Sequence, residues 1–252
     1  MTSSPRITAA CLLALGISTA ASAAPYELAV YTDEIAAVGE VEFETVLSLA
    51  HPRAGKELPG HVWQALGEVN YGFAKGWEVG LEVPAVYATG RHKVQGLAVE
   101  LQYIAPHDKT SGWVWGVRAD LGRIASLYED DTALSLELNP IIGYRGAGYR
   151  LAFNPSLERP LRGKETSTRF QPSAKLAVRA SGQDEVGAEY FADWGDVRKL
   201  LPSSRRDETL YLVWDRQTSF GRLNMGLGQA LRPTSGSADK WVAKVGLQFD
   251  TD

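Results

Sequence analysis

Residues 69–83 read Val69-Asn70-Tyr71-Gly72-Phe73-Ala74-Lys75-Gly76-Trp77-Glu78-Val79-Gly80-Leu81-Glu82-Val83, two alternating segments around one short turn. Alternation with a period of two places successive side chains on opposite faces of a β-strand. One face of these segments is apolar and free of charge, whereas the other face of the second segment carries Glu78 and Glu82. Segments of about ten residues with this pattern, separated by turn residues, are typical of membrane barrels, in which one face meets lipid and the other the lumen.

The whole chain has about twelve segments with this pattern, and their apolar faces exclude charge although 22% of the residues are charged. A charge on the lipid face costs about 2 to 4 kcal/mol at the bilayer midplane, so membrane insertion requires this exclusion. A soluble sandwich also alternates, but it has no need of a clean face on every strand. The sequence therefore predicts an all-β fold, a closed antiparallel up-and-down transmembrane β-barrel of about twelve strands. The expected strands are residues 40–50, 61–73, 77–87, 97–103, 113–121, 134–144, 149–157, 170–180, 186–192, 210–214, 223–231 and 241–249.

Aromatic residues and connection lengths favour the same fold. Aromatic residues such as Trp63, Tyr87 and Trp113 stand near the ends of expected strands, where amphipathic rings reach the headgroup level. Connections after even-numbered strands are short, for example 74–76 and 145–148, whereas several after odd-numbered strands are longer and polar. Short turns on the periplasmic side and longer loops on the outer side produce this alternation. An even strand number then leaves both ends of the barrel in the periplasm.

The first residues predict a secretory signal. Arg6 supplies a positive charge, residues 9–20 form a short apolar stretch, and Ala21-Ser22-Ala23 offers small residues for cleavage. The apolar stretch is too short to cross a bilayer as a helix, which needs about 20 residues. The expected organisation is a signal peptide at 1–23, a periplasmic arm or plug at 24–39, and a barrel at 40–252.

Composition argues against several classes of protein. The 26 basic and 30 acidic side chains give a formal charge of -4, without the basic excess that a nucleic-acid partner requires. The single cysteine, Cys11, lies in the predicted signal, so the exported chain forms no disulfide. We expect no cofactor, because the sequence has no glycine-rich phosphate loop. The acidic run Tyr128-Glu129-Asp130-Asp131 is typical of a solvated loop, so we also expect no metal site.

An outer-membrane lipid hydrolase is the enzymatic alternative. Such an enzyme needs a nucleophile with a base within about 3 Å. Of the four histidines, His107 is expected in a turn, His51 and His92 in loops, and only His61 begins a strand with lipid-face parity. The residues expected beside His61 are leucines, which are not nucleophiles. The sequence therefore predicts no catalytic residue and no enzyme.

Charged residues at the alternate positions indicate how the lumen is lined. The first strands contribute glutamates and the middle strands contribute basic residues, and strand 1 lies across from strand 7 in a closed barrel of twelve strands. Two arrangements remain open: facing charged walls that create a transverse field, or a narrow lumen filled with ion pairs. The acidic wall is Glu42, Glu44, Glu68, Glu78, Glu82 and Glu100, and the basic wall is Arg150, Arg169, Lys175 and Arg179.

Three prolines fall on neighbouring expected strands, namely Pro140, Pro155 and Pro172. Proline has no backbone N–H and is rare in central strands. The sequence therefore predicts a bend or weakened pairing in this sector, and a lateral opening toward the bilayer is its functional form.

Several motifs resemble a family of Gram-negative outer-membrane proteins named for the meta-pathway of phenol degradation. They are Tyr31-Thr32-Asp33-Glu34, Gly39-Glu40-Val41-Glu42-Phe43-Glu44, Tyr71-Gly72-Phe73, Trp77-Glu78-Val79-Gly80-Leu81-Glu82-Val83-Pro84 and Asn154-Pro155-Ser156-Leu157-Glu158. The resemblance extends over most of the expected barrel. It implies a transport role, uptake of aromatic compounds, and brings no catalytic residue.

These observations predict a passive outer-membrane channel or transporter for small solutes, with aromatic or apolar compounds as candidates. The alternative is a structural or interaction barrel with a closed lumen, and a lipid hydrolase is a third class. The expected partners are outer-membrane lipid and an unidentified small solute. Phe249 resembles the terminal aromatic of the assembly signal, although Asp250-Thr251-Asp252 follow it, so the barrel-assembly machinery is a further expected partner during insertion.

Overall fold

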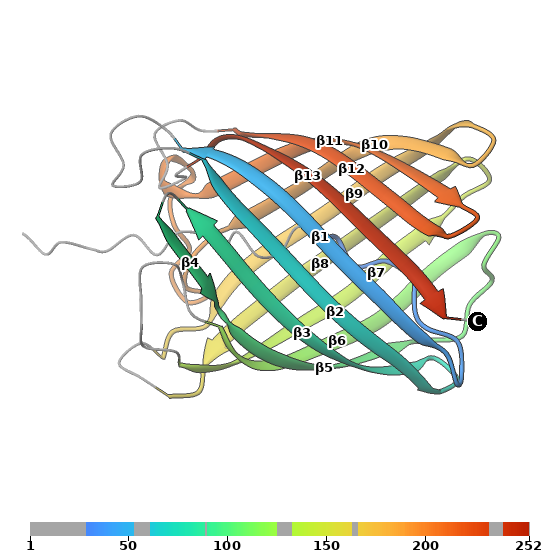
Figure 1. The fold of residues 1–252 in the computed structure, drawn as a ribbon, viewed down its shortest axis with the longest axis horizontal. Helices are drawn as coiled ribbons and strands as arrows, with labels where there is room; N and C mark the ends of the chain where they lie inside the picture. Colours follow the sequence, from blue (N-terminus) through green and yellow to red (C-terminus); the bar gives the residue numbers. More distant parts are fainter. Residues whose placement is uncertain are drawn as a thin grey trace, which may run out of the picture.

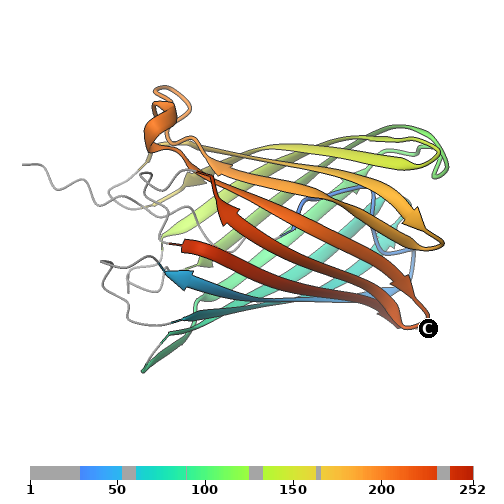
Figure 2. The ribbon, with the colours of Figure 1, turned by 90° about the horizontal axis from the view of Figure 1, so that it is seen from above.

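The computed structural model describes residues 29–52, 61–88, 90–124, 133–162, 166–231 and 239–251. The predicted signal peptide at 1–23 and the acidic run at 128–131 lie outside these residues. The described residues form one barrel of tilted antiparallel strands (Figures 1 and 2). Within them, no helix is long and apolar enough to span a bilayer.

The strands follow the predicted alternation closely. Most of them begin or end a few residues beyond the range expected from the sequence. They are β1 (Val41–Pro52), β2 (Val62–Ala74), β3 (Trp77–Ala88), β4 (Arg91–Val94), β5 (Gly96–Ile104), β6 (Gly112–Ile124), β7 (Leu134–Arg145), β8 (Tyr149–Pro160), β9 (Arg169–Ser181), β10 (Asp184–Asp193), β11 (Asp207–Thr218), β12 (Gly221–Ala230) and β13 (Asp239–Thr251), with a short 3₁₀ turn, η1 (Ser203–Arg205), between β10 and β11.

The barrel closes because β1 pairs with strands on both of its sides. It pairs with β13 from Val41 opposite Thr251 to His51 opposite Trp241, and with β2 along most of its length. The other pairings join strands that follow each other in the chain, except that β3 pairs with both β4 and β5. The predicted closed up-and-down antiparallel barrel is therefore confirmed.

The segments β4 and β5 occupy one position in the barrel. β3 pairs with β4 through Ala85–Ala88 and with β5 through Trp77–Glu82. Gln95 lies between the two segments and donates its backbone N–H to the Pro84 carbonyl at 2.8 Å. Pro84 has no N–H with which to continue the ladder, so the strand is interrupted opposite it. Thirteen segments thus make twelve strand positions, as the sequence predicted.

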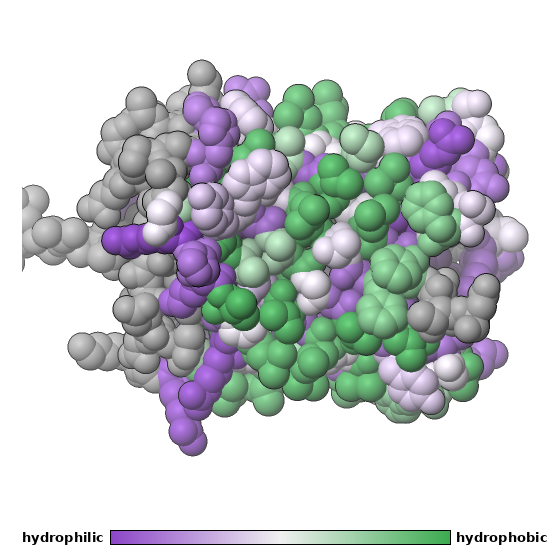
Figure 3. Space-filling model, in the orientation of Figure 1, coloured by the Kyte–Doolittle hydropathy of each residue, from purple (hydrophilic) through white to green (hydrophobic). Residues whose placement is uncertain are grey.

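The outer surface carries the apolar belt that a membrane requires. Figure 3 shows a mostly apolar band across the middle of one face, with polar residues toward both ends. Leu81, Leu101 and Leu136 are exposed on this surface, and Leu227 is 61% exposed. Aromatic rings gather where short turns join the strands: the Trp77 and Tyr103 rings lie 4.6 Å apart, and those of Trp113 and Tyr144 lie 5.3 Å apart. Such rings favour the headgroup level of the bilayer.

The two ends of the barrel differ. One end, here called the turn end, holds the short turns 75–76, 146–148, 182–183 and 219–220 and the C-terminal end of β13 (Figure 1). The opposite end, here called the loop end, holds the connection from β10 to β11. The chain before β1, residues 29–40, forms no strand and is here called the N-terminal segment; its contacts place it inside the barrel.

Candidate functional site

Strand alternation turns the charged residues inward, so the lumen is the candidate site. The acidic wall of the sequence analysis lies there, since Glu42, Glu68, Glu78 and Glu100 are buried and Glu44 and Glu82 are half-buried. Five of these six residues, all but Glu100, line one lumen cavity, here called the lumen cavity, of about 280 Å³.

A single cation on β6 organises the acidic wall. The Arg118 guanidinium, 3% exposed, binds four carboxylates from four strands. The distances are 3.1 Å to Glu68 Oε1, 2.7 Å to Glu100 Oε2, 3.5 Å to Glu82 Oε2 and 2.9 Å to Asp120 Oδ1. Because charge in the acidic wall is balanced from β6, the wall is less negative than its own residues suggest. The sequence analysis did not include Arg118 in this wall.

Three of these carboxylates also satisfy the spacing of a metal site. One oxygen from each of Glu68, Glu82 and Glu100 lies within 4.8 Å of the others. The Arg118 guanidinium contacts all three, so an added cation would meet a resident positive charge. The arrangement is chemically an ion-pair network.

The basic wall is balanced in the same way, by carboxylates of the N-terminal segment and of nearby strands. Arg150 binds Glu34 at 2.6 Å and Glu185 at 2.8 Å. Lys175 binds Glu189 and Asp215, both at 2.8 Å.

The remaining basic residues divide between the network and the rim. Glu189 also pairs with Lys244 of β13, and Arg169 pairs with Asp193, whereas Arg179 is exposed at the turn end. Of the two arrangements that the sequence left open, the contacts of the described residues favour a lumen filled with ion pairs. Facing walls of unbalanced charge would require that few acidic residues lie beside the basic ones. In the structure β10 and β11 place acidic residues beside them, so the charge of the basic wall is balanced.

The N-terminal segment crosses the lumen and is held by buried side chains of the barrel. The fully buried Asn154 side chain accepts the Tyr31 N–H at 2.9 Å and donates to the Tyr31 carbonyl at 3.1 Å. Glu78 accepts the Ala36 N–H at 2.8 Å, and Gln102 donates to the Glu34 carbonyl at 3.0 Å. The barrel thus recognises the backbone of this segment at three places.

Side chains of the segment add charged contacts. The Tyr31 ring lies 4.4 Å from the Arg118 guanidinium, and Glu34 pairs with Arg150 and Arg222. Asp33 accepts two bonds from Arg145 Nη2, at 2.6 and 2.8 Å, and contacts His107 Nε2 at 3.0 Å. The segment therefore connects the acidic wall, the basic wall and the turn end.

The ionisation of Asp33 follows from these contacts. Burial alone would raise the pKa of its carboxyl group, but the hydrogen bonds and charge of Arg145, together with the hydrogen bond of His107, outweigh burial. The pKa of Asp33 is held below its usual value, so Asp33 is an anion at neutral pH.

Gly72 is required where the segment meets β2. A Cβ at this position would lie 2.2 Å from the Ala37 carbonyl oxygen and 2.5 Å from that of Ala36. At the same place the Gly39 N–H donates a hydrogen bond to the Gly72 carbonyl at 2.7 Å. The absence of a side chain therefore allows the segment to lie directly on the wall.

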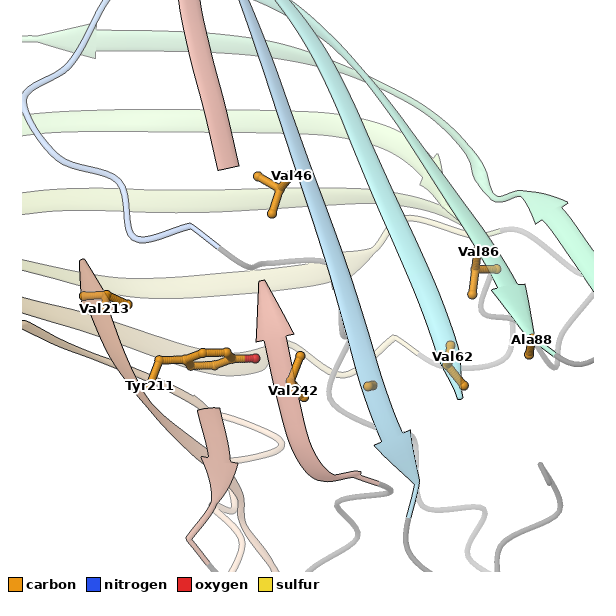
Figure 4. Packing of buried hydrophobic residues seen from close by; sticks show 8 residues of the cluster. Val46, Val62, Val86, Ala88, Tyr211, Val213 and Val242 are labelled. Carbon is orange, nitrogen blue, oxygen red and sulfur yellow. The ribbon is translucent and has the colours of Figure 1, made fainter. Parts of the chain in front are cut away.

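One side of the lumen is apolar toward the loop end, which the sequence analysis did not predict. Its inward side chains come from β1, β2, β3, β11 and β13 (Figure 4) and form the outer apolar cluster. Leu66 and Phe191 pack against it, and the Lys244 ammonium lies 5.1 Å from the Tyr211 ring centre. The cluster consists of Val46, Ala50, Val62, Val86, Ala88, Tyr211, Val213 and Val242.

The three prolines at which the sequence predicted a bend or weakened pairing lie side by side on β7, β8 and β9. Pro155 is opposite Pro172, and the register of β7 and β8 places Pro140 opposite Pro155. Pairing of β7 with β8 stops at Leu138–Leu157 and resumes at Ile142–Phe153. Missing N–H groups explain this gap. On the outer surface beside it, Ile142, Phe153 and their neighbours line a largely apolar depression of about 440 Å³.

Comparison with known proteins bears on the fold. No protein-family model and no curated protein match the sequence, so the resemblance to the phenol meta-pathway family rests on its motifs. Among solved structures, the chain is similar to an outer membrane channel from Pseudomonas putida F1, with a TM-score of 0.59 and 12% identity over 89% of this chain and 100% of that one. It is more distantly similar to the translocator domain of the autotransporter NalP from Neisseria meningitidis, with a TM-score of 0.46 and 9% identity over 87% and 90% of the two chains.

Fold and surface together define the class. A closed antiparallel barrel satisfies all backbone hydrogen bonds without an edge, which the hydrocarbon core demands, and its charge-free belt matches its lipid surroundings. The chain is a transmembrane β-barrel of the bacterial outer-membrane type, located in that membrane and surrounded by its lipid.

Proposed function

We propose that the chain is a passive outer-membrane channel for small solutes that carry an aromatic or apolar part. The observation that carries this proposal is a lumen cavity that both kinds of side chain line. Val46, Ala50, Tyr211 and Val242 of the outer apolar cluster lie on its wall together with the ion-paired groups. A water-filled barrel has a polar interior, so apolar side chains turned inward on five strands offer a surface for an apolar group. The charged groups deeper in the lumen would meet the polar end of the same solute.

In this proposal the turn end faces the periplasm and the loop end faces the outside. Residues 1–23 are a signal peptide that is removed, residues 24–39 are a plug, and residues 40–252 are the barrel. Phe249 stacks on Phe43 with ring centres 5.5 Å apart, at the seam where β13 meets β1. An assembly machinery that inserts the last strand would meet this aromatic residue first.

The N-terminal segment controls passage in this proposal. Its contacts with Asn154, Glu78, Gln102 and Arg145 hold it across the lumen between the outer apolar cluster and the turn end. A solute reaches the periplasm only when these contacts open.

The proline row, Pro140, Pro155 and Pro172, offers a second route for apolar solutes, sideways into the bilayer. The unpaired stretch of β7 and β8 adjoins the apolar depression on the outer surface. Cysteines at Asn139 and Ser156, opposite each other in the gap, would lock the wall as a disulfide. Locking should slow delivery of an apolar dye to the bilayer and leave ion conductance unchanged; equal dye delivery in the locked and reduced forms contradicts the lateral route.

Liposome swelling with amino acids tests the solute class. Phenylalanine and serine share a zwitterionic end and differ in the apolar part, so a size-selective pore admits serine faster. We expect barrels lacking residues 29–36 to admit phenylalanine at least as fast as serine. Val46→Thr and Val213→Thr keep the side-chain shape and should restore the advantage of serine, whereas Thr209→Val, a change in the opposite direction on the same lumen surface, should not.

Two outcomes would favour the other classes. No swelling with either amino acid, in full-length and shortened barrels alike, would indicate a structural or interaction barrel with a closed lumen. Release of fatty acid from phospholipid vesicles that depends on His61 would indicate a lipid hydrolase.

A further inference from the structure

Two histidines meet on the outer surface at the loop end. His51 is the penultimate residue of β1 and His61 directly precedes β2. Because the last paired residues of these strands are Ala50 and Val62, His51 and His61 occupy the next cross-strand position. Their ring centres lie 4.9 Å apart. His51 also faces Trp241 of β13 in register, with ring centres 5.6 Å apart and the planes nearly parallel at 15°.

This pair takes no part in the lumen. His51 has the parity of Leu47 and Leu49, which point outward, so its ring lies at the border of the lipid belt. Its Nδ1 atom is buried and has no hydrogen-bond partner among the described residues. A buried polar atom without a partner is destabilising, and a bound ligand would relieve this cost.

The chemistry of two adjacent neutral imidazoles is that of a metal chelate. Imidazole nitrogen suits Zn²⁺, Ni²⁺ and Cu²⁺, and a Zn–N bond measures about 2.0 to 2.1 Å, so two nitrogens on one ion lie about 3.3 Å apart. Ring nitrogens lie about 1 Å from the ring centre, so rings at this separation reach that spacing by small rotations within their rotamers.

We propose that His51 and His61 bind one divalent transition-metal ion, with water in its remaining coordination positions. The ion would join the end of β1 to the start of β2 on the outer rim. Arg118 occupies the middle of the glutamate cluster in the lumen, whereas none of the ion pairs among the described residues involves His51 or His61. The His61 and Trp241 ring centres are 6.1 Å apart, which puts an indole beside the bound ion.

Binding is measured on the tag-free full chain in detergent micelles, with Cu²⁺, Ni²⁺ and Zn²⁺ as separate probes, by calorimetry and by tryptophan fluorescence. We expect one ion per chain, with Cu²⁺ bound most tightly, and saturable quenching by Cu²⁺. His51→Ala and His61→Ala should each weaken binding at least tenfold. His92→Ala, which removes an exposed imidazole from β4 on the same side of the barrel, should leave the affinity unchanged.

A second variant separates the site from nonspecific effects. Trp241→Phe should remove most of the saturable quenching while calorimetric binding persists, and heat-modifiable migration shows that each variant is folded. The proposal is overturned if His51→Ala and His61→Ala bind like the unchanged chain. It is equally overturned if the folded chain takes up no ion at millimolar metal, or if inorganic phosphate and not the metals shows binding that depends on these histidines.

Discussion

Asp33→Asn perturbs the contact on which the proposed gating depends. The change removes one negative charge and nearly preserves side-chain shape, and Asp33 is the anchor between the N-terminal segment and the turn end through Arg145 and His107. The barrel strands do not include this residue, so the barrel itself should assemble normally.

The magnitude follows from the contacts. A hydrogen bond to a charged group contributes about 1.5 to 3 kcal/mol. Asparagine retains one acceptor oxygen, and the Arg145 side chain is 29% exposed, so solvent weakens the pair. We estimate a net loss of about 2 kcal/mol for docking of the segment, which raises its undocked fraction about 30-fold, because about 1.4 kcal/mol is a factor of ten.

The assay uses the fact that Cys11 is the only cysteine and lies in the predicted signal peptide. A cysteine introduced at Thr32, a residue that lines the lumen cavity, reacts with a membrane-impermeant thiol reagent when the segment leaves its site. Asp33→Asn should raise the modification rate about 30-fold in purified barrels.

Asp108→Asn is the matched control, because the Asp108 carboxylate is exposed and bonds Thr110 in its own turn at 2.8 and 2.6 Å. It should leave the rate within about twofold. An Asp33→Asn barrel that is folded by heat-modifiable migration and yet reacts at the unchanged rate would refute the reasoning.

Three further predictions concern the same interior. The pKa of Asp33 is lowered in the docked state, so its contribution to docking is complete above the ordinary Asp pKa of about 3.9 and is lost as pH falls through the lower docked value. Thr32→Cys reactivity should therefore be constant from pH 7 to 5 and rise in stronger acid. A rise that begins near pH 6 would point to another group. Gly72→Ala places a Cβ 2.2 Å from the Ala37 carbonyl oxygen of the N-terminal segment, so it should also raise the reactivity of Thr32→Cys. Gly67→Ala is the control, because its Cβ has an ordinary contact at 4.0 Å, and it should leave the reactivity unchanged. Equal reactivity in the two variants would contradict the close packing at Gly72. Arg118→Met leaves buried carboxylates without their cation, a change worth about 3 to 5 kcal/mol, so it should lower the temperature of heat modification, and an unchanged temperature would show that the network is not needed for stability.

The strands were predictable because lipid imposes a simple rule on every one of them. Outward positions exclude charge, and this restriction is visible in residues such as Val79 and Leu81 without any knowledge of pairing. The interruption at Gln95 was not predictable in the same way, since it depends on which backbone groups lie opposite Pro84.

The lumen was predictable in composition and not in partners. Parity alone places Glu68 and Lys175 inside, but their partners Arg118 and Asp215 stand on other strands, and the cross-strand distances depend on tilt and register. The N-terminal segment is not a strand, so its sequence shows no alternation of apolar and polar residues. It is held through its backbone by barrel side chains such as Asn154, which its own sequence does not reveal. The outer apolar cluster was missed because inward valines were not counted alongside the inward charges, and that signal was present in the sequence.

The central claim is a passive channel that the N-terminal segment closes, and planar-bilayer recording tests it most directly. Chains with and without residues 29–36 are reconstituted at equal amounts after heat-modifiable migration has shown both to be folded. The account predicts little steady current from the full chain and stable, ohmic single-channel steps from the shortened one. Absence of current from the folded shortened barrel, or equal current from both, would contradict it.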